Sequence, residues 1–286
     1  MTRTSVRVAL FFVLASGLSA VADEPRADGE SKVQVTFYAM GDVPYAPEED
    51  VLLPKQISEL PVDAEFVIHV GDIKRGLPLC NEAVYQKVAG MLSQSAAPVF
   101  IIPGDNEWND CLDPAQAWKY WDKYFMRFDQ RWPHQLTVVR QEVRTENFAF
   151  VRNNVLFVGL NIVGGRVHDR QEWKLRHASG LDWVKANLQR AGKDVSSLIV
   201  FGHAKPAMIH QDFFDPFSRM AEEFKKPVLY IHGDGHKWIY DRPFKAQNIL
   251  RVEVDQGGIA PPLKVRITNH PATPFEFDRR NGKPAS

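Results

Sequence analysis

The sequence predicts an α/β protein whose core consists of two β-sheets flanked by helices. Short apolar runs rich in β-branched and aromatic residues recur along the 286-residue chain, and five of them are followed by a Gly-Asp or Gly-His motif. Such runs are typical of buried strands. Three β-α units come first, and a β meander follows them. Two more β-α units and then further strands complete the chain. This order, with β-α units on both sides of a β meander, favours two sheets.

Each apolar run in turn gives a strand. Strands are predicted at residues 33–40, 65–70, 99–102, 136–140, 147–151, 155–161, 197–201, 228–231, 249–254 and 263–268. Asn153-Asn154 is the predicted turn inside the meander, and Gly164-Gly165 closes it.

The helices follow from spacing and from their end signals. They are predicted at residues 48–60, 81–93, 114–125, 181–191 and 213–224. The first ends at Pro61 and the fourth at Gly192, residue types that stop helices. In the second, Val84 and Val88 share a face. The third is rich in Trp and Tyr, which we assign to the core rather than to a ligand site.

Residues 1–22 are predicted to be a signal peptide. Arg3 and Arg7 supply a basic start, residues 8–15 are apolar, and Ala20-Val21-Ala22 provides the small residues of a cleavage site. The apolar segment is too short to span a bilayer. The alternative is an uncleaved anchor.

We expect residues 23–32 to be a flexible leader, residues 33–269 a single domain, and residues 270–286 a loose C-terminal tail. The leader and the tail are polar and rich in Pro, Gly and charge. The composition, with 44% hydrophobic and 24% charged residues and a formal net charge of 0, is that of a globular protein. It argues against a stable nucleic acid partner. No membrane contact is expected after signal cleavage. Because the chain begins with a predicted signal peptide, the protein is predicted to be secreted or periplasmic.

Cys80 and Cys111 are the two cysteines of the chain. Each follows a strand-end aspartate by a few residues, which places both on loops at the same edge of the sheets. In an exported protein an even pair indicates a disulfide. The alternative is two free thiols.

Acidic and histidine residues follow the ends of five strands. These candidate metal ligands are Asp42, Asp72, Asp105, His203, Asp234 and His236. The carboxyl ends of parallel strands meet at one edge of a sheet, so the side chains are expected to converge. Carboxylates that close repel one another unless a cation is present. Mixed oxygen and nitrogen ligands suit Zn, Fe, Mn or Mg.

These motifs, from Gly41 to His236, resemble the calcineurin-like metallophosphoesterase superfamily. The resemblance implies a four-layer αββα sandwich of two mixed sheets, the metallo-dependent phosphatase fold, with two divalent metal ions. It implies that Asp42 and His236 bind the first metal, that Asp72 bridges both, and that His203 binds the second. By their positions, Asp105 and Asp234 are assigned to the second metal.

Several residues depart from the superfamily pattern. Pro44 stands where a histidine ligand is usual, and Tyr45 or water is the next candidate for the first metal. Asn106 stands in the position of the catalytic histidine and cannot act as a general acid. Asp234 replaces another histidine, although a carboxylate can still bind metal.

The function implied is hydrolysis of a small phosphorylated substrate by water activated between two metals. Asn106, Lys74 and Lys205 are the predicted catalytic residues, as groups that bind the phosphate oxygens; Arg75 is a further cation beside them. Two alternatives stay open. One is a phosphodiesterase or nuclease, and the other is a catalytically degenerate protein that binds metal or phosphate on the same fold.

Overall fold

The computed structural model describes Met1, residues 31–77 and residues 79–280. Apart from Met1, the predicted signal peptide lies outside the described residues, as does most of the predicted leader. Within the described part, no helix combines the length and the apolar character needed to cross a bilayer.

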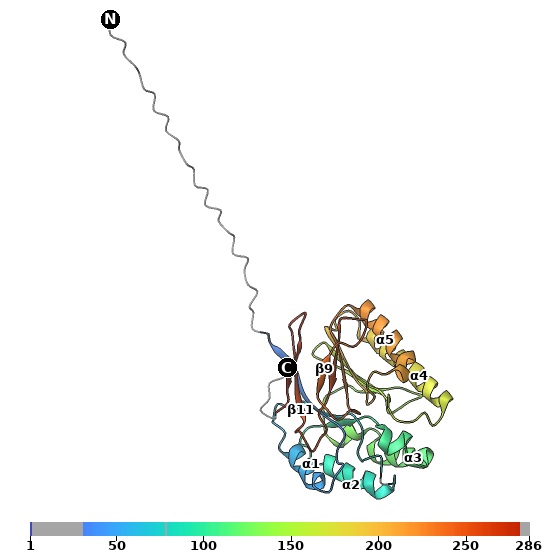
Figure 1. Ribbon diagram of the computed structural model, residues 1–286. Coiled ribbons are helices and arrows are strands. Elements are labelled where there is room, and N and C mark those ends of the chain that lie inside the picture. Colours follow the sequence, from blue (N-terminus) through green and yellow to red (C-terminus); the bar gives the residue numbers. More distant parts are fainter. Residues whose placement is uncertain (2–30, 78, 281–286) are drawn as a thin grey trace. The chain divides into compact units, whose positions relative to one another are not determined.

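Two β-sheets form the centre of the structure (Figure 1). The first has five strands in the order β12-β11-β1-β2-β3, and β1, β2 and β3 run parallel. Its strands are β1 (Val33–Met40), β2 (Val67–His69), β3 (Val99–Ile101), β11 (Leu263–Thr268) and β12 (Phe275–Asp278). The pairs formed by β11 with β1 and with β12 are antiparallel, so this sheet is mixed.

The second sheet has seven strands in the order β4-β5-β6-β7-β8-β10-β9. They are β4 (Val139–Arg140), β5 (Phe148–Arg152), β6 (Val155–Gly159), β7 (Ser197–Phe201), β8 (Val228–His232), β9 (Ile239–Asp241) and β10 (Ile249–Glu253). The run from β6 through β7 and β8 to β10 is parallel, and antiparallel pairs lie at both edges. Both sheets are thus mixed, as predicted.

Helices cover the outer faces of the two sheets. They are α1 (Glu49–Ser58), α2 (Glu82–Leu92), α3 (Pro114–Phe125), α4 (Arg170–Ala191) and α5 (Gln211–Phe224), with short turns η1 (Asp105–Asn109), η2 (Phe128–Arg131) and η3 (Met208–His210). Apolar side chains of α1, α2 and α3 pack on the first sheet, and those of α4 and α5 pack on the second (Figure 1). The four-layer αββα sandwich is confirmed.

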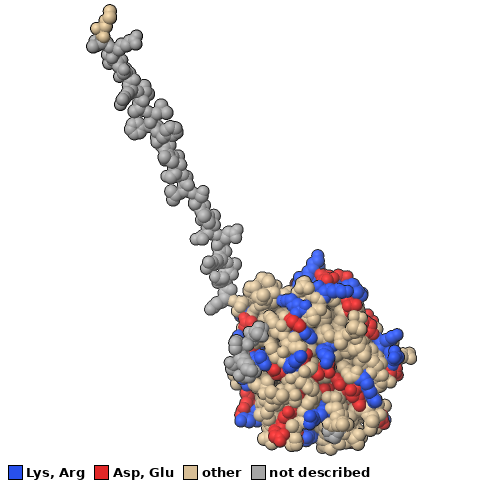
Figure 2. All heavy atoms as spheres, in the orientation of Figure 1, with Lys and Arg blue, Asp and Glu red and all other residues tan. Residues whose placement is uncertain are grey.

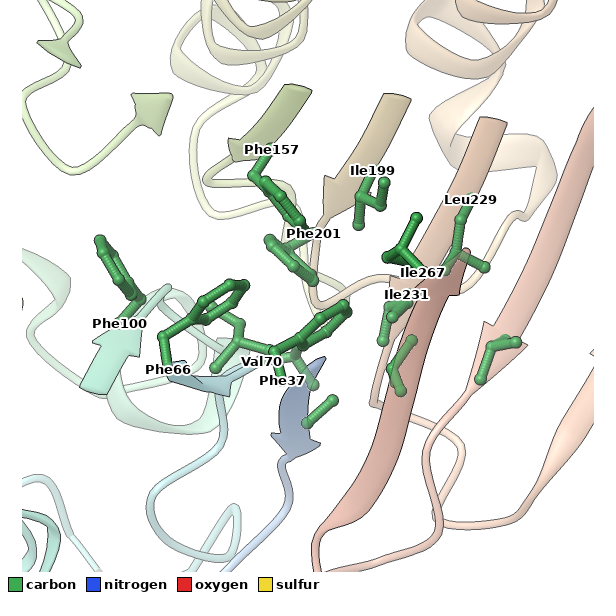
Figure 3. Packing of buried hydrophobic residues seen from close by; sticks show 14 of the residues in the cluster. Phe37, Phe66, Val70, Phe100, Phe157, Ile199, Phe201, Leu229, Ile231 and Ile267 are labelled. Carbon is green, nitrogen blue, oxygen red and sulfur yellow. The ribbon is translucent and has the colours of Figure 1, made fainter. Parts of the chain in front are cut away.

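A layer rich in phenylalanine joins the inner faces of the two sheets (Figure 3). Phe37 and Phe66 of the first sheet stack with ring centroids 4.9 Å apart. Phe157 and Phe201 of the second sheet meet them edge-on, at 5.3 Å from Phe66 and 5.7 Å from Phe37 respectively. Such edge-to-face pairs add to the stabilisation from burial alone. The sheets are held in one relative position, which fixes where their strand ends meet.

Three local predictions need correction. The tail expected to be loose contains β12, which pairs with β11 and packs Phe275 and Phe277 against the core between the sheets. Strand β9 was not predicted. Helix α4 begins at Arg170 rather than at residue 181, because its first turns bury Arg176 and His177, which carry no apolar signal.

On the face shown in Figure 2, charges of both signs are interspersed.

Candidate metal centre

The predicted ligands come together because the strands that precede them are neighbours. Asp42, Asp72 and Asp105 directly follow the adjacent parallel strands β1, β2 and β3. His203 and His236 follow the adjacent parallel strands β7 and β8 of the other sheet. Sheet packing brings the two sets of carboxyl ends to one edge, as open α/β sheets do at their ligand sites.

Two groups of three side chains are arranged to hold a metal ion, and Asp72 belongs to both. Asp42, Asp72 and His236 form one group, and Asp72, Asp105 and His203 form the other; within each, one ligand atom per residue lies within 4.8 Å of the others. His236 Nε2 is 3.4 Å from Asp42 Oδ1. His203 Nε2 is 3.0 Å from Asp105 Oδ1 and 3.4 Å from Asp72 Oδ1. One shared carboxylate between two clusters is the arrangement expected of a bridging ligand.

The loops that carry these groups are strained. Asp42, Asp72, Asp234 and His236 all have positive φ, between 56° and 75°. Residues other than glycine adopt this left-handed conformation only at a cost, and such strain gathers at functional sites. The backbones also approach closely, because a Cβ on Gly104 would lie 2.2 Å from the Asp72 amide nitrogen. A glycine is required there for the second and third motifs to touch.

Hydrogen bonds orient His203 and Asp72. His203 Nδ1 lies 2.8 Å from the Val70 carbonyl, which can only accept, so Nδ1 carries the proton and Nε2 faces the carboxylates. Asp72 Oδ2 accepts from the Tyr45 hydroxyl at 2.6 Å and from the Asn106 side-chain amide. Its other oxygen accepts from the Asn106 backbone amide at 3.0 Å.

Glu107 is a buried acid that ties two ligand loops together. Its Oε1 accepts from the backbone amides of Gly104, at 2.5 Å, and Asp72, at 3.2 Å. The contact of Glu107 with the Asp72 amide depends on the meeting of two distant motifs, so no local pattern in the sequence predicts it. Burial, together with the charge of Asp72, raises the pKa of Glu107 to about 8.

The donor set fits a metal. Asp42 Oδ2, Asp105 Oδ1 and His203 Nε2 are buried and have no hydrogen-bond partner among the residues that the structure describes. Buried polar atoms without a partner are costly and call for an explanation. Asp105 Oδ1 and His203 Nε2 face each other within the second cluster, and all three are atoms of the types that bind divalent ions.

The pKa shifts of the clustered side chains also favour a bound cation. Burial raises the pKa of Asp42 and, with the charge of Asp72, raises that of Asp105 to about 6. Burial would also raise the pKa of Asp72, but the charge of His203 and hydrogen bonds hold it at about 2. Burial would lower the pKa of His203, yet Asp72 and Asp105 raise it well above its usual value. The raised pKa favours a second proton on His203, at Nε2, which balances the charge of the acids in place of a bound cation.

Asp234, assigned to the second metal, stands outside both clusters of three. Its backbone amide donates to Asp42 Oδ1 at 3.3 Å, and its Oδ2 lies 3.7 Å from Lys205 Nζ. A Cβ on Gly164 would lie 3.1 Å from Asp234 Oδ1 and 3.2 Å from Asp105 Oδ1. Asp234 therefore borders the second site, and its role as a ligand stays a prediction.

The predicted phosphate-binding groups differ in their freedom. Lys74 is buried, and its ammonium donates to the carbonyls of Arg75, Gly76 and Asn106, so its three donors are used within the loop. Asn106 is turned toward Asp72. The Lys205 side chain is about half exposed at the rim. Of the two lysines, Lys205 is thus the one free to meet a ligand.

The side chain of Pro44 has no atom that can bind a metal, and the neighbouring Tyr45 lies at the first cluster instead. Its hydroxyl lies 3.3 Å from Asp42 Oδ1 and donates to Asp72, between the two carboxylates of the first cluster. A recess of about 290 Å³ opens there, lined in part by Tyr45, Arg75, Asn106 and His236. This recess is large enough for a phosphate group beside the first cluster.

The disulfide between Cys80 and Cys111 is confirmed, with Cα atoms 5.9 Å apart. The two sulfurs lie 3.4 and 3.6 Å from the Asn106 carbonyl oxygen. The cross-link therefore braces the loop after Asp72 against the turn that carries Asp105 and Asn106.

No protein-family model matches the sequence, and it matches no curated protein. Solved structures with a similar fold include GAP50, the anchor in the inner membrane complex of Plasmodium (TM-score 0.58, 14% identity, 89% of this chain and 88% of that chain). A 5'-nucleotidase from Candida albicans (TM-score 0.52, 12% identity, 87% and 52%) and a purple acid phosphatase from yellow lupin seeds (TM-score 0.52, 14% identity, 90% and 53%) are also similar. This chain spans about half the length of these two enzymes. The likeness shows the fold alone: the chain has the metallo-dependent phosphatase fold.

Proposed function

We propose that the protein is an exported phosphoesterase that hydrolyses a small phosphate ester with two divalent metal ions, of Mn, Zn, Fe or Mg. The observation that carries this proposal is the place of Asp72 in both ligand clusters. Two ions that share a carboxylate would lower the pKa of a water molecule and supply positive charge to the phosphate.

The chain's own residues would hold and orient these partners. Asp42 and His236 with Asp72 would bind the first ion, and Asp105 and His203 with Asp72 the second. Asn106 fixes Asp72 through its amide groups. Lys205 and Arg75 stand at the rim, where their positive charges would draw in a phosphate oxygen.

The position of the usual catalytic acid holds Asn106, whose amide does not release a proton near neutral pH. The leaving group would then take its proton from solvent. Esters whose alcohol is stable as an anion would react faster than simple alkyl esters.

The test combines metal content with turnover. Elemental analysis of the purified protein should give about two ions per chain, and a generic aryl phosphate should be hydrolysed when Mn, Zn, Fe or Mg is added back. Asp72→Asn, which keeps size but removes the shared charge, should lose metal and activity. The exposed Asp63→Asn, which carries the same change away from the site, should behave like wild type. Full activity in Asp72→Asn would contradict the assignment.

Two alternatives have observations of their own. The position of Asp234 outside both clusters, with Pro44 and Asn106 in place of histidines, favours a degenerate protein that binds metal or phosphate without turnover; one tight ion and no hydrolysis would identify it. A phosphodiesterase is distinguished by comparing a monoester with a diester chromogenic substrate.

Export is supported by the disulfide, because such bonds persist in oxidising compartments. We infer a secreted or periplasmic location. To test this location, the protein would be assayed in the soluble and membrane fractions of cells that express the full chain, and its mature N-terminus would be determined by mass spectrometry. We expect it in the soluble exported fraction with an N-terminus at Asp23.

A further inference from the structure

A cavity in the described structure lies next to the second ligand cluster, and none of the candidate metal ligands lines it. It has a volume of about 910 Å³, within the range of small-molecule sites. Trp108 and Trp118 from the η1–α3 segment, Val143 and Glu146 from the β4–β5 connection, and Leu175 from α4 contribute to its lining. Three separate parts of the chain thus close around one space.

The walls of this cavity are mainly apolar and aromatic. The rings of Trp108 and Trp118 lie 4.8 Å apart between centroids. Val143 and Leu175 are large apolar side chains that stay 79% and 55% exposed. Aromatic walls beside apolar side chains that are exposed to solvent are typical of a site that binds a flat apolar ligand.

Three of the charged side chains that line the cavity are paired with one another. Arg144 contacts Glu172 at 3.0 Å and Glu146 at 3.5 Å. Glu146 also accepts from the Asn161 amide at 3.0 Å. The lining also includes Asp113 and Lys119, and Arg176 Nε lies 3.2 Å from Glu172. Counted with Arg176, the three carboxylates are matched by three cations, so the cavity offers no excess charge to an ionic ligand and suits a neutral one.

The cavity is joined to the metal centre by the chain itself. Trp108 lies three residues after Asp105 in the same turn. Ile162, which follows the cavity residue Asn161, accepts from the His203 backbone amide at 2.9 Å. Gly164 lies against Asp105 and Asp234. A group attached to a phosphate at the second cluster would therefore have this cavity as its neighbour.

We propose that the cavity binds the leaving group of the substrate, and that this group is a neutral aromatic alcohol. This inference rests on the proposed phosphoesterase activity. It agrees with the lack of a catalytic acid at Asn106, because a phenol has a pKa of about 10 and leaves as an anion far more readily than an alkyl alcohol. Aromatic walls and an unassisted leaving group thus select the same chemical class, an aryl phosphate.

Binding of the free alcohol tests the site without any need for hydrolysis. Calorimetric titration should show that 2-naphthol binds and that its saturated counterpart decahydro-2-naphthol binds several-fold more weakly, by roughly fivefold, because only the flat ring can stack. Leu175→Glu places a carboxylate on the wall and should weaken 2-naphthol by about tenfold. Val51→Glu is the matched control, since Val51 is also an exposed helical residue (75%), on α1, and it should bind like wild type. Equal binding of both alcohols, or no effect of Leu175→Glu, overturns the aromatic site.

Kinetics then separate this inference from the proposed function. The ratio of kcat/KM for 2-naphthyl phosphate to that for glycerol phosphate should fall in Leu175→Glu by about the same tenfold factor, and it should keep the wild-type value in Val51→Glu. An unchanged ratio with active enzyme overturns the leaving-group role alone. Selective binding of 2-naphthol without hydrolysis of either ester overturns the phosphoesterase proposal and the leaving-group role with it, and leaves an aromatic binding site.

Discussion

The disulfide between Cys80 and Cys111 makes a measurable contribution that follows from its place in the chain. It closes a loop with a sequence separation of 31 residues. The loop-closure entropy removed from the unfolded chain corresponds to about 4 kcal/mol for a loop of this length. For a domain of this size, that corresponds to a loss of roughly 8–15 °C in Tm when the bond is absent.

The double variant Cys80→Ser, Cys111→Ser tests this value. Its free energy of unfolding, measured by guanidinium denaturation and circular dichroism, should be about 4 kcal/mol below that of wild type. Wild type denatured in the presence of a reductant should give the same value, which controls for the serine side chains. Because both sulfurs lie against Asn106, the variant should also release metal to a chelator more readily. A difference below about 1 kcal/mol in both comparisons would refute the entropic reasoning.

The remaining predictions concern single side chains. Glu107→Gln should remove a pH dependence: with its pKa raised to about 8, folded Glu107 keeps a proton that the unfolded chain loses above its usual pKa of 4.5, so stability falls as pH rises between these values. The slope is about 1.4 kcal/mol per pH unit, and unfolding of metal-free protein at several pH values should show it flatten in the variant. Tyr45→Phe removes a donor to Asp72 and should make one of two bound ions more sensitive to a chelator; equal retention of both would exclude Tyr45 from the first site. Phe201→Ala empties a fully buried position between the sheets and should cost about 3–5 kcal/mol in denaturation experiments, whereas Val51→Ala on the exposed face of α1 should change little.

The local signals of the sequence were sufficient for most elements. The strand Val33–Met40 and the helix Pro114–Phe125 have the predicted bounds. The strand is an unbroken apolar run, and the helix starts at Asp113-Pro114, a pair typical of helix N-termini. The strand-end motifs also predicted which side chains would converge, since parallel neighbours share a carboxyl edge. The pairing of Cys80 with Cys111 was predictable because there were only two cysteines.

Tertiary structure decided what each convergent side chain does. Lys74 follows a ligand as closely as a phosphate-binding lysine would, yet the folded loop offers three carbonyls to its ammonium. Helix α4 starts a full eleven residues early because packing buries Arg176 between Trp108 and Trp173, with its guanidinium 4.9 and 4.7 Å from the ring centroids. The aromatic cavity likewise arises from segments far apart in the chain. Periodicity records which residues avoid water, whereas the partners of a buried charge and the shape of a cavity depend on contacts between distant segments, and these exist only once the two sheets have packed.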